Sequence, residues 1–369
     1  MDLASLTFRR IASSLAVLSL AAAAVGQTGC GDSGTGGSGG GGSACPDNLV
    51  PATNSEFCAG TTVEPDCTIV DLSATHQVCG VALVDPPGEL TRSSNVIENS
   101  GDGPPDIACL TPDGYPAAPG VSEDVEVTGF ARIFSSGCDS HGLKITFFRV
   151  QADGQLGEQV GTPVETPETC VDIGDLTDVE DCGDRWECAY TYVGVPTETE
   201  LAIRTENADG SELWAPLVQY NIYIPAAEVD AGGWEHDVRA LAEPDYSVIP
   251  GTAIGSPITP GNGAVAGEVH DCGDVRLSNA VADIDKSRRL TTYFTSNEDS
   301  PLPDSAAEGT SVLGLYAALD VPEGPVTVAA GGFVNGEFVA LGQHRVWVYP
   351  DTVTSVTFKG LRPYQLPAE

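Results

Sequence analysis

The sequence predicts an all-β protein built of two β-sandwiches in tandem, and two observations lead to this fold class. Apolar and polar residues alternate with a period of two in many segments after residue 122, as in strands that have one buried and one solvated face. The order of these segments in the second half of the chain repeats their order in the first half, which indicates an internal duplication. Long amphipathic helix patterns are missing from this part of the sequence.

The clearest strand patterns lie in three short segments. Apolar side chains fall on one face of the segments 125–134 (VEVTGFARIF), 143–148 (LKITFF) and 218–224 (VQYNIYI). A single segment is a helix candidate, because Trp234, Val238 and Leu241 fall at helical spacing within GGWEHDVRALAEP. It lies between the two predicted sandwiches.

The duplication is visible as matched segments in the same order. The corresponding pairs are VTGFARI (127–133) with VAGEVHD (265–271), and YNIYIP (ending at Pro225) with VWVYP (ending at Pro350). Between them, Pro196 and Pro322 occupy equivalent places, and the intervals from these prolines to the final ones are 29 and 28 residues. The near-equal spacing favours a true repeat over two unrelated sandwiches.

The N-terminus has the pattern of an exported protein. Arg9 and Arg10 precede an apolar run at 11–25, which is short for a membrane-spanning helix and suits the core of a signal peptide. Thr28-Gly29-Cys30 follows and resembles the lipobox of bacterial lipoproteins, which implies a lipid on Cys30. The alternative is an ordinary signal peptide cut nearby, with Cys30 in a disulfide.

The eleven cysteines bear on this choice, because an odd number in an exported protein leaves one unpaired. A lipid on Cys30 leaves ten for disulfides, which an oxidising compartment favours. The disulfide candidates are Cys45, Cys58, Cys67, Cys79, Cys109, Cys138, Cys170, Cys182, Cys188 and Cys272. Five of them fall between Cys45 and Cys109, so one is expected to pair outside that segment.

Changes in composition divide the chain into six parts. They are a signal peptide (1–29), the lipidated cysteine with a flexible Gly/Ser linker (30–44), a Cys-rich disulfide-stapled segment (45–122), a first sandwich (123–226), a linker (227–262) and a second sandwich (263–369). The Cys-rich segment is either a small stapled module or an N-terminal elaboration of the domain that follows it.

The second sandwich carries a recognisable pattern. It opens with Gly263, Val265, Gly267 and Val269, and continues with Gly-Leu-Tyr at 314–316 and a Pro-Glu-Gly turn at 322–324. This pattern resembles carboxypeptidase-regulatory-like domains over roughly residues 263–360, which implies a transthyretin-like β-sandwich and a non-catalytic accessory or surface module. The first sandwich keeps the opening strand and Pro196 but lacks the turn glycine.

The charge balance excludes some partners. Sixteen basic residues against 53 acidic ones give a net charge of −37, and such a field repels the phosphate backbone of nucleic acids. The tetrapeptide Asp-Cys-Gly-Asp occurs twice, so a calcium site is one interpretation of Asp181, Asp184, Asp271 and Asp274. The competing interpretation is a pair of tight turns, in which Asp and Gly are common. No other cofactor is expected.

No catalytic residue can be identified from a motif, because the five histidines lack metal-ligand spacing and no nucleophile elbow or phosphate loop occurs. We therefore expect a non-catalytic lipoprotein at the cell envelope, at the outer membrane or cell surface, whose sandwiches bind an envelope protein or glycan. The alternatives are a hydrolase with an acidic site formed only in three dimensions, and a structural spacer.

Two features of the tertiary structure distinguish these functions. A pocket with convergent carboxylates or a histidine favours the hydrolase. An exposed platform made from Trp186, Trp214, Trp234 or Trp347 favours glycan binding, although tryptophans in β-proteins are usually buried.

Overall fold

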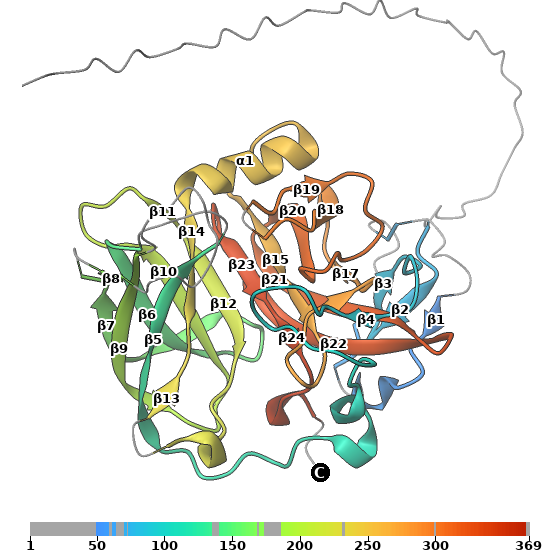
Figure 1. Ribbon diagram of the computed structural model, residues 1–369, viewed down its shortest axis with the longest axis horizontal. Helices are drawn as coiled ribbons and strands as arrows, with labels where there is room; N and C mark the ends of the chain where they lie inside the picture. Colours follow the sequence, from blue (N-terminus) through green and yellow to red (C-terminus); the bar gives the residue numbers. More distant parts are fainter. Residues whose placement is uncertain are drawn as a thin grey trace, which may run out of the picture. The chain divides into compact units, whose positions relative to one another are not determined.

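Strands dominate the computed structural model of this protein, as the period-two pattern predicts (Figure 1). The structure describes residues 49–58, 61–63, 70–71, 73–134, 140–167, 170–172, 186–230, 233–298 and 300–366. The predicted signal peptide, Cys30 and the linker lie outside these residues, as do Cys45, Cys67, Cys138, Cys182, Asp181 and Asp184. Among the described residues, no helix combines the length and apolar character needed to cross a membrane.

The first β unit is a sandwich of two sheets. One layer has the strand order β12-β10-β6-β7, and the other has β11-β14-β5-β9-β8, with β13 also paired to β5. The strands are β5 (Asp124–Ile133), β6 (Leu143–Val150), β7 (Leu156–Glu165), β8 (Val171–Asp172), β9 (Trp186–Pro196), β10 (Leu201–Asn207), β11 (Trp214–Ala215), β12 (Leu217–Ile222), β13 (Trp234–Glu235) and β14 (Val238–Ala242). Their inward residues, including Phe147 and Tyr192, form one buried cluster.

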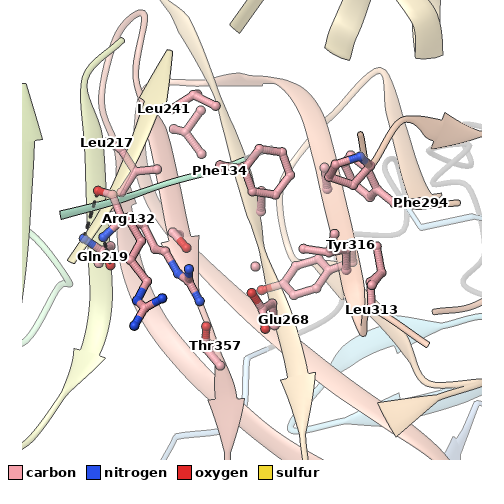
Figure 2. Close-up of a pocket in the computed structure, with 18 of the residues that line it drawn as sticks. Arg132, Phe134, Leu217, Gln219, Leu241, Glu268, Phe294, Leu313, Tyr316 and Thr357 are labelled. Atoms are coloured by element: carbon pink, nitrogen blue, oxygen red, sulfur yellow. Dashed lines mark hydrogen bonds between the residues drawn. The ribbon is translucent and has the colours of Figure 1, made fainter. Parts of the chain in front are cut away.

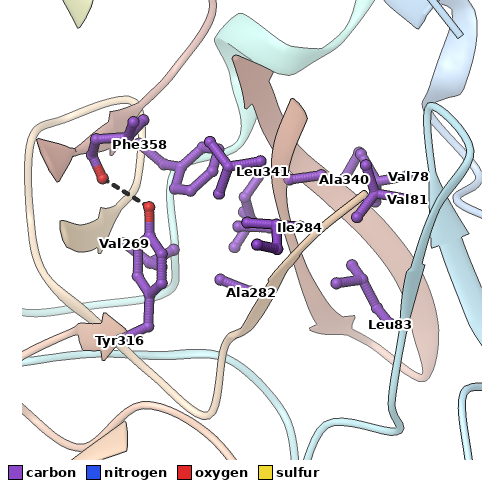
Figure 3. Packing of buried hydrophobic residues seen from close by; sticks show 14 of the residues in the cluster. Val78, Val81, Leu83, Val269, Ala282, Ile284, Tyr316, Ala340, Leu341 and Phe358 are labelled. Carbon is purple, nitrogen blue, oxygen red and sulfur yellow. Dashed lines mark hydrogen bonds between the residues drawn. The ribbon is translucent and has the colours of Figure 1, made fainter. Parts of the chain in front are cut away.

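The second β unit is also a sandwich. Its layers are β19-β18-β20-β15-β23, with β24 beside β15, and β17-β21-β22. The strands are β15 (Asn262–His270), β16 (Leu277–Ser278), β17 (Val281–Ile284), β18 (Leu290–Phe294), β19 (Pro303–Asp304), β20 (Leu315–Pro322), β21 (Gly324–Val334), β22 (Glu337–Val348), β23 (Val353–Val356) and β24 (Phe358–Lys359). A short 3₁₀ helix, η5 (Pro363–Gln365), follows. In the core, the Tyr316 hydroxyl donates to the Val356 carbonyl at 2.9 Å (Figure 3).

The tandem sandwiches are joined through a single sheet. Strand β12 of the first unit pairs in parallel with β23 of the second, and β23 pairs in parallel with β15 (Figure 1). A ten-stranded sheet therefore runs through both units. Because the pairing hides an edge strand of each unit, it also removes two unpaired sheet edges.

The strand pairing repeats between the units, which supports the predicted duplication. In β5–β9, Asp124 pairs with Pro196 and the register shifts after Val125. In β15–β20, Asn262 pairs with Pro322 and the register shifts at the same place, after Gly263. On its other edge each opening strand meets parallel strands, β13 and β14 in the first unit and β23 and β24 in the second.

The Cys-rich segment packs on the second unit, which is not the unit that follows it in sequence. Its elements are β1 (Val50–Pro51), η1 (Ser55–Cys58), β2 (His76–Val78), β3 (Val81–Leu83), β4 (Thr91–Arg92), η2 (Ala108–Leu110) and η3 (Pro112–Gly114). Val78 and Leu83 share a buried cluster with Leu341 of β22 (Figure 3). The Asn54 side chain also covers the edge of β22, because it accepts from the Ala340 N–H at 2.7 Å and donates to the Ala340 carbonyl at 3.1 Å.

Disulfides form as expected for an exported protein. The described residues include the pairs Cys58–Cys79, Cys109–Cys272 and Cys170–Cys188. Cys109–Cys272 joins the Cys-rich segment to the second unit, so it is the pair outside the segment that the odd count requires.

The helix candidate at 232–244 is wrong, because β13 and β14 occupy most of that segment. Parallel pairing with β5 decides the outcome, with Arg239 opposite Arg132. The α-helix of the described chain, α1 (Glu243–Ile254), comes directly afterwards. Pro244 suits its first turn, and Gly255 in the left-handed conformation ends it. The predicted linker 227–262 thus contains β13, β14 and α1, and the 3₁₀ helix η4 (Ala226–Glu228) overlaps its beginning.

Candidate binding cavity

A cavity of about 600 Å³ lies over the middle of the ten-stranded sheet (Figure 2). Strands β12, β23, β15 and β20 form its floor. The opposite wall comes from the end of β5, β14, α1 and residues 97–99 of the Cys-rich segment. Its volume falls within the range of small-molecule sites in proteins, and its lining comes from both sandwiches.

The floor changes from apolar to charged along three strands that run parallel. The registers of β12, β23 and β15 place equivalent residues side by side, and every second side chain lines the cavity. The first row is apolar and consists of Leu217, Val353 and Ala264. The second is small and uncharged: Gln219, Ser355 and Ala266. Farther along lie Thr357, Glu268, His270 and Lys359. Since a strand rises ~3.3 Å per residue, the gradient from Val353 to Lys359 spans about 20 Å.

The opposite wall has the same gradient. Arg132 of β5 lies beside Arg239 of β14, and two residues later both strands turn apolar, with Phe134 and Leu241. Figure 2 shows Leu217 and Leu241 at one end of the cavity and Thr357 and Glu268 at the other. The Phe134 ring meets the Phe294 ring edge-on, at 6.4 Å between centroids. One end of the cavity is therefore an aromatic and aliphatic pocket.

At the charged end, three arginines share the carboxylate of Glu98. The distances to Glu98 are 2.6 Å from Arg239, 3.2 Å from Arg132 and 3.9 Å from Arg276. Burial alone would raise the pKa of Glu98, but the arginines outweigh it and lower that pKa. Because Glu98 belongs to the Cys-rich segment and the arginines belong to both sandwiches, this cluster ties three parts of the chain together.

His270 is held between two carboxylates. Its Nε2 lies 2.7 Å from Glu268 and its Nδ1 lies 2.8 Å from Asp274. Burial opposes a charge on the ring, but the hydrogen bonds to Asp274 and Glu268 raise the pKa of His270. Both ring nitrogens face carboxylate oxygens, so the surroundings of the ring favour its protonated form. Arg276 also contacts Glu268, at 3.0 Å.

These contacts bear on the hydrolase alternative. Carboxylates and a histidine do converge in the cavity, as that alternative requires. The pKa values of Glu98, Glu268 and Asp274 are nevertheless all lowered, because partners that outweigh burial stabilise each anion. Each of these three carboxyls therefore favours its ionised form, so the proton donor that the surroundings favour in this cavity is His270 and not a carboxyl.

Two carboxyls with raised pKa values lie elsewhere. Burial raises the pKa of Glu200 to about 7. Burial also raises the pKa of Asp283 to about 6, against the attraction of Arg288, to which Asp283 is hydrogen-bonded. Neither residue lines the cavity, so they add no acid to it.

Two nitrogen groups at the charged end lack partners. Within the described residues, the Lys359 ammonium makes no hydrogen bond and has no carboxylate within ion-pair distance, and burial lowers its pKa. His236 lines the same cavity, and burial lowers its pKa to about 3, so its ring is neutral. The His236 Nε2 atom is buried without a hydrogen-bond partner. Its ring stacks on Trp234, with centroids 5.0 Å apart.

The predicted calcium ligands of the second Asp-Cys-Gly-Asp copy act as turn residues. Asp271 is fully buried and accepts from Arg92 Nε at 2.5 Å and from the N–H groups of Asp106 and Gly273. Asp274 bonds His270. Among the described residues, no group of three His, Cys, Asp or Glu side chains is arranged to hold a metal ion. The calcium interpretation thus gains no support at this copy, and the first copy lies outside the described residues.

The tryptophans whose side chains are described form no exposed platform. Trp214 is buried and donates to the His141 carbonyl at 2.9 Å, and Trp234 is covered by the ring of His236. Trp347 is partly buried within β22. The glycan-binding criterion is therefore not met in the described part of the chain.

Sequence motifs do not reveal the residues of this cavity. Glu98 and Arg276 carry no local signal, since they meet only in the folded chain. One signal could have been found, because 353–359 reads Val-Thr-Ser-Val-Thr-Phe-Lys. Every second residue there becomes more polar, whereas the alternate residues Val356 and Phe358 belong to the core.

Comparisons with known proteins give only weak similarities. No family model matches the sequence, and no curated protein matches it. The Bacillus anthracis TIE protein is 11% identical, with a TM-score of 0.17, over 66% of this chain and 35% of its own. GBS52, the minor pilin of Streptococcus agalactiae, is 9% identical, with a TM-score of 0.18, over 66% of this chain and 99% of its own. The RrgB pilus protein from Streptococcus pneumoniae is 11% identical, with a TM-score of 0.18, over 68% of this chain and 49% of its own. Similarity this low establishes neither a shared fold nor a shared function.

Proposed function

We propose that this chain is a non-catalytic binding protein whose cavity takes up a small amphipathic molecule. The observation that carries the proposal is the shared gradient of the cavity walls, from Leu217, Phe134 and Leu241 to the charged cluster. An apolar body would lie against the first end and a polar head against the second. Each buried CH₂ group of such a ligand contributes roughly 0.8 kcal/mol before the cost of association.

The exposed lining residues support the same orientation. Ile97 is 57% exposed, and the Asp274 side chain is 50% exposed. Both belong to the charged end, so the head group would lie at the mouth of the cavity and the apolar body would lie inside.

The cavity also favours a binding protein over a structural spacer. Apolar lining that stays open to water forgoes the free energy gained by burying it. A spacer gains nothing from leaving this lining open, whereas in a binding protein the ligand covers it.

The proposed cellular context is the envelope, with a lipid on Cys30 holding the protein at the outer membrane or cell surface. The sandwich loops remain the expected contacts for an envelope protein or glycan. We expect a labelled palmitate precursor to mark the wild type and not Cys30→Ala. Ser33→Ala, in the same linker, should keep the label. Equal labelling of Cys30→Ala and wild type would show that the anchor assignment is wrong.

A cavity-filling substitution tests the binding proposal. Ala266 lies in the middle row of the floor, so Ala266→Phe should fill the space that the apolar body needs. We expect saturable binding of 11-(dansylamino)undecanoic acid to the wild type and affinity weakened at least about tenfold in the variant. Fluorescence titration measures both.

Ala306→Phe is the matched control, because Ala306 is exposed in a turn away from the cavity. It should bind the probe like the wild type. The proposal fails if the wild type does not bind the probe, or if a folded Ala266→Phe variant binds it unchanged. Circular dichroism establishes the fold of each variant.

A further inference from the structure

We propose that the head group of the ligand is a carboxylate, held by the ammonium of Lys359 at the charged end of the cavity. This inference rests on the proposed binding function and specifies the ligand that the cavity selects. It follows from how the cations of the cavity are paired.

Four cations of the cavity already have carboxylate partners. Arg132 lies 2.6 Å from Asp237, Arg239 lies 2.6 Å from Glu98, and Arg276 lies 3.0 Å from Glu268. His270 contacts two carboxylates. Among the described residues, Lys359 is the cavity cation without one.

The anions nearest to Lys359 are committed to other groups. Asp274 and Glu268 act electrostatically on Lys359, but Asp274 binds His270, and Glu268 binds both His270 and Arg276. The register of β24 fixes the lysine beside these groups, because Lys359 pairs with His270 across the parallel strands. A carboxylate from outside the chain would give this half-buried ammonium both a hydrogen-bond acceptor and a counter-charge.

His236 adds a second reason for an acceptor. A neutral imidazole can donate from one ring nitrogen, and the buried Nε2 of His236 has no partner of its own. Lys359 acts electrostatically on His236, so the two unsatisfied groups share one region of the cavity. Ser355 and Thr357 precede Lys359 on the same floor and supply hydroxyls toward the middle of the ligand.

Other head groups fit less well. A cationic head would be repelled by Lys359 and would find the neighbouring carboxylates already paired. An alcohol could accept one hydrogen bond but would leave the ammonium without a counter-charge. A carboxylate supplies both acceptor atoms and charge.

Calorimetric titration with decanoate and decan-1-ol tests the inference, because the two share a ten-carbon body and differ in the head. We expect wild type to bind decanoate at least about tenfold more tightly than decan-1-ol. Lys359→Met should weaken decanoate by about tenfold and change decan-1-ol by less than about twofold. Lys286→Met is the matched control, since Lys286 donates to the Glu323 carbonyl and lies outside the cavity.

The outcomes separate the two proposals. If wild type and Lys359→Met bind both ligands with equal affinity, the carboxylate inference is overturned and the amphiphile cavity stands. If neither ligand nor the dansyl probe binds wild type, the proposed function itself is overturned.

A second measurement on the wild type covers the case in which Lys359→Met does not fold. The chain has three lysines, Lys144, Lys286 and Lys359. Decanoate should protect Lys359 from acetylation by acetic anhydride, as read by peptide mass spectrometry, and leave the other two unprotected. Unchanged acetylation of Lys359 at saturating decanoate would count against the inference.

Discussion

Asp271→Ala should lower the free energy of unfolding by about 3–5 kcal/mol, because it removes the anion of a buried ion pair. The Asp271 side chain is fully buried and lies 2.5 Å from Arg92 Nε. It also accepts from the N–H groups of Asp106 and Gly273, at 2.8 and 2.9 Å. Alanine would leave the Arg92 charge and these N–H groups unsatisfied at the contact between the Cys-rich segment and the second sandwich.

Asp274→Ala is the control, since it alters the other aspartate of the same tetrapeptide. Its side chain is half exposed and bonds only His270 among the hydrogen bonds of the described chain, so the expected loss is below about 1.5 kcal/mol. Urea denaturation of both variants measures the difference. Equal losses would show that Asp271 does not organise this contact.

Gly267→Ala should lower the free energy of unfolding by about 3 kcal/mol although it adds a single methyl group. A Cβ atom at Gly267 would lie 1.8 Å from the carbonyl oxygen of Val356. The obstacle is backbone, so β15 and the β23–β24 segment would have to separate, and the floor of the cavity would be distorted. Denaturation measures the stability, and probe titration should show weaker binding.

Because of the duplication, the equivalent substitution in the first unit should have a similar effect on stability. At the equivalent Gly129, a Cβ atom would lie 1.9 Å from the carbonyl oxygen of His236, so Gly129→Ala should cost a similar amount. Gly251→Ala in α1 is the control, because nothing lies within 4 Å of its Cβ position and alanine favours helix by about 0.5–1 kcal/mol. If Gly267→Ala leaves the free energy of unfolding unchanged, the close approach of the parallel strand does not require glycine.

Local pattern was enough to predict the strands and their repeated order. Side chains of a strand alternate between its two faces, so Val127 and Ala131 lie on the same face, and both are buried. This holds regardless of which strands lie beside β5. Pro196 and Pro322 pair with the first residues of the two opening strands, close to equivalent register shifts. In the segment around Val238 the spacing of Trp234, Val238 and Leu241 fits a helix and not a strand, and only pairing with β5 selects the strand.

The candidate site could be predicted only in part. The repeated tetrapeptide marks Asp271 as a candidate residue in the sequence. Its partner Arg92, which donates to it, is far away in sequence, so the sequence alone could not distinguish a metal ligand from a turn residue. Lys359 had no motif at all. Lys359 is singled out because the arginines of the cavity are already paired with carboxylates. Those carboxylates, Glu98, Asp237 and Glu268, come from three different parts of the chain.

The sequence by itself determined the all-β class, the duplicated order of strands and the need for one cysteine to pair outside the Cys-rich segment. These properties follow from period, spacing and parity, which are local or countable. The tertiary structure alone decided that β12 joins β23, that the Cys-rich segment packs on the second sandwich, and that Glu98 gathers three arginines. These contacts join residues far apart in sequence, most of them by more than a hundred positions. Their stability depends on burial and on competing partners, which no short stretch of sequence contains.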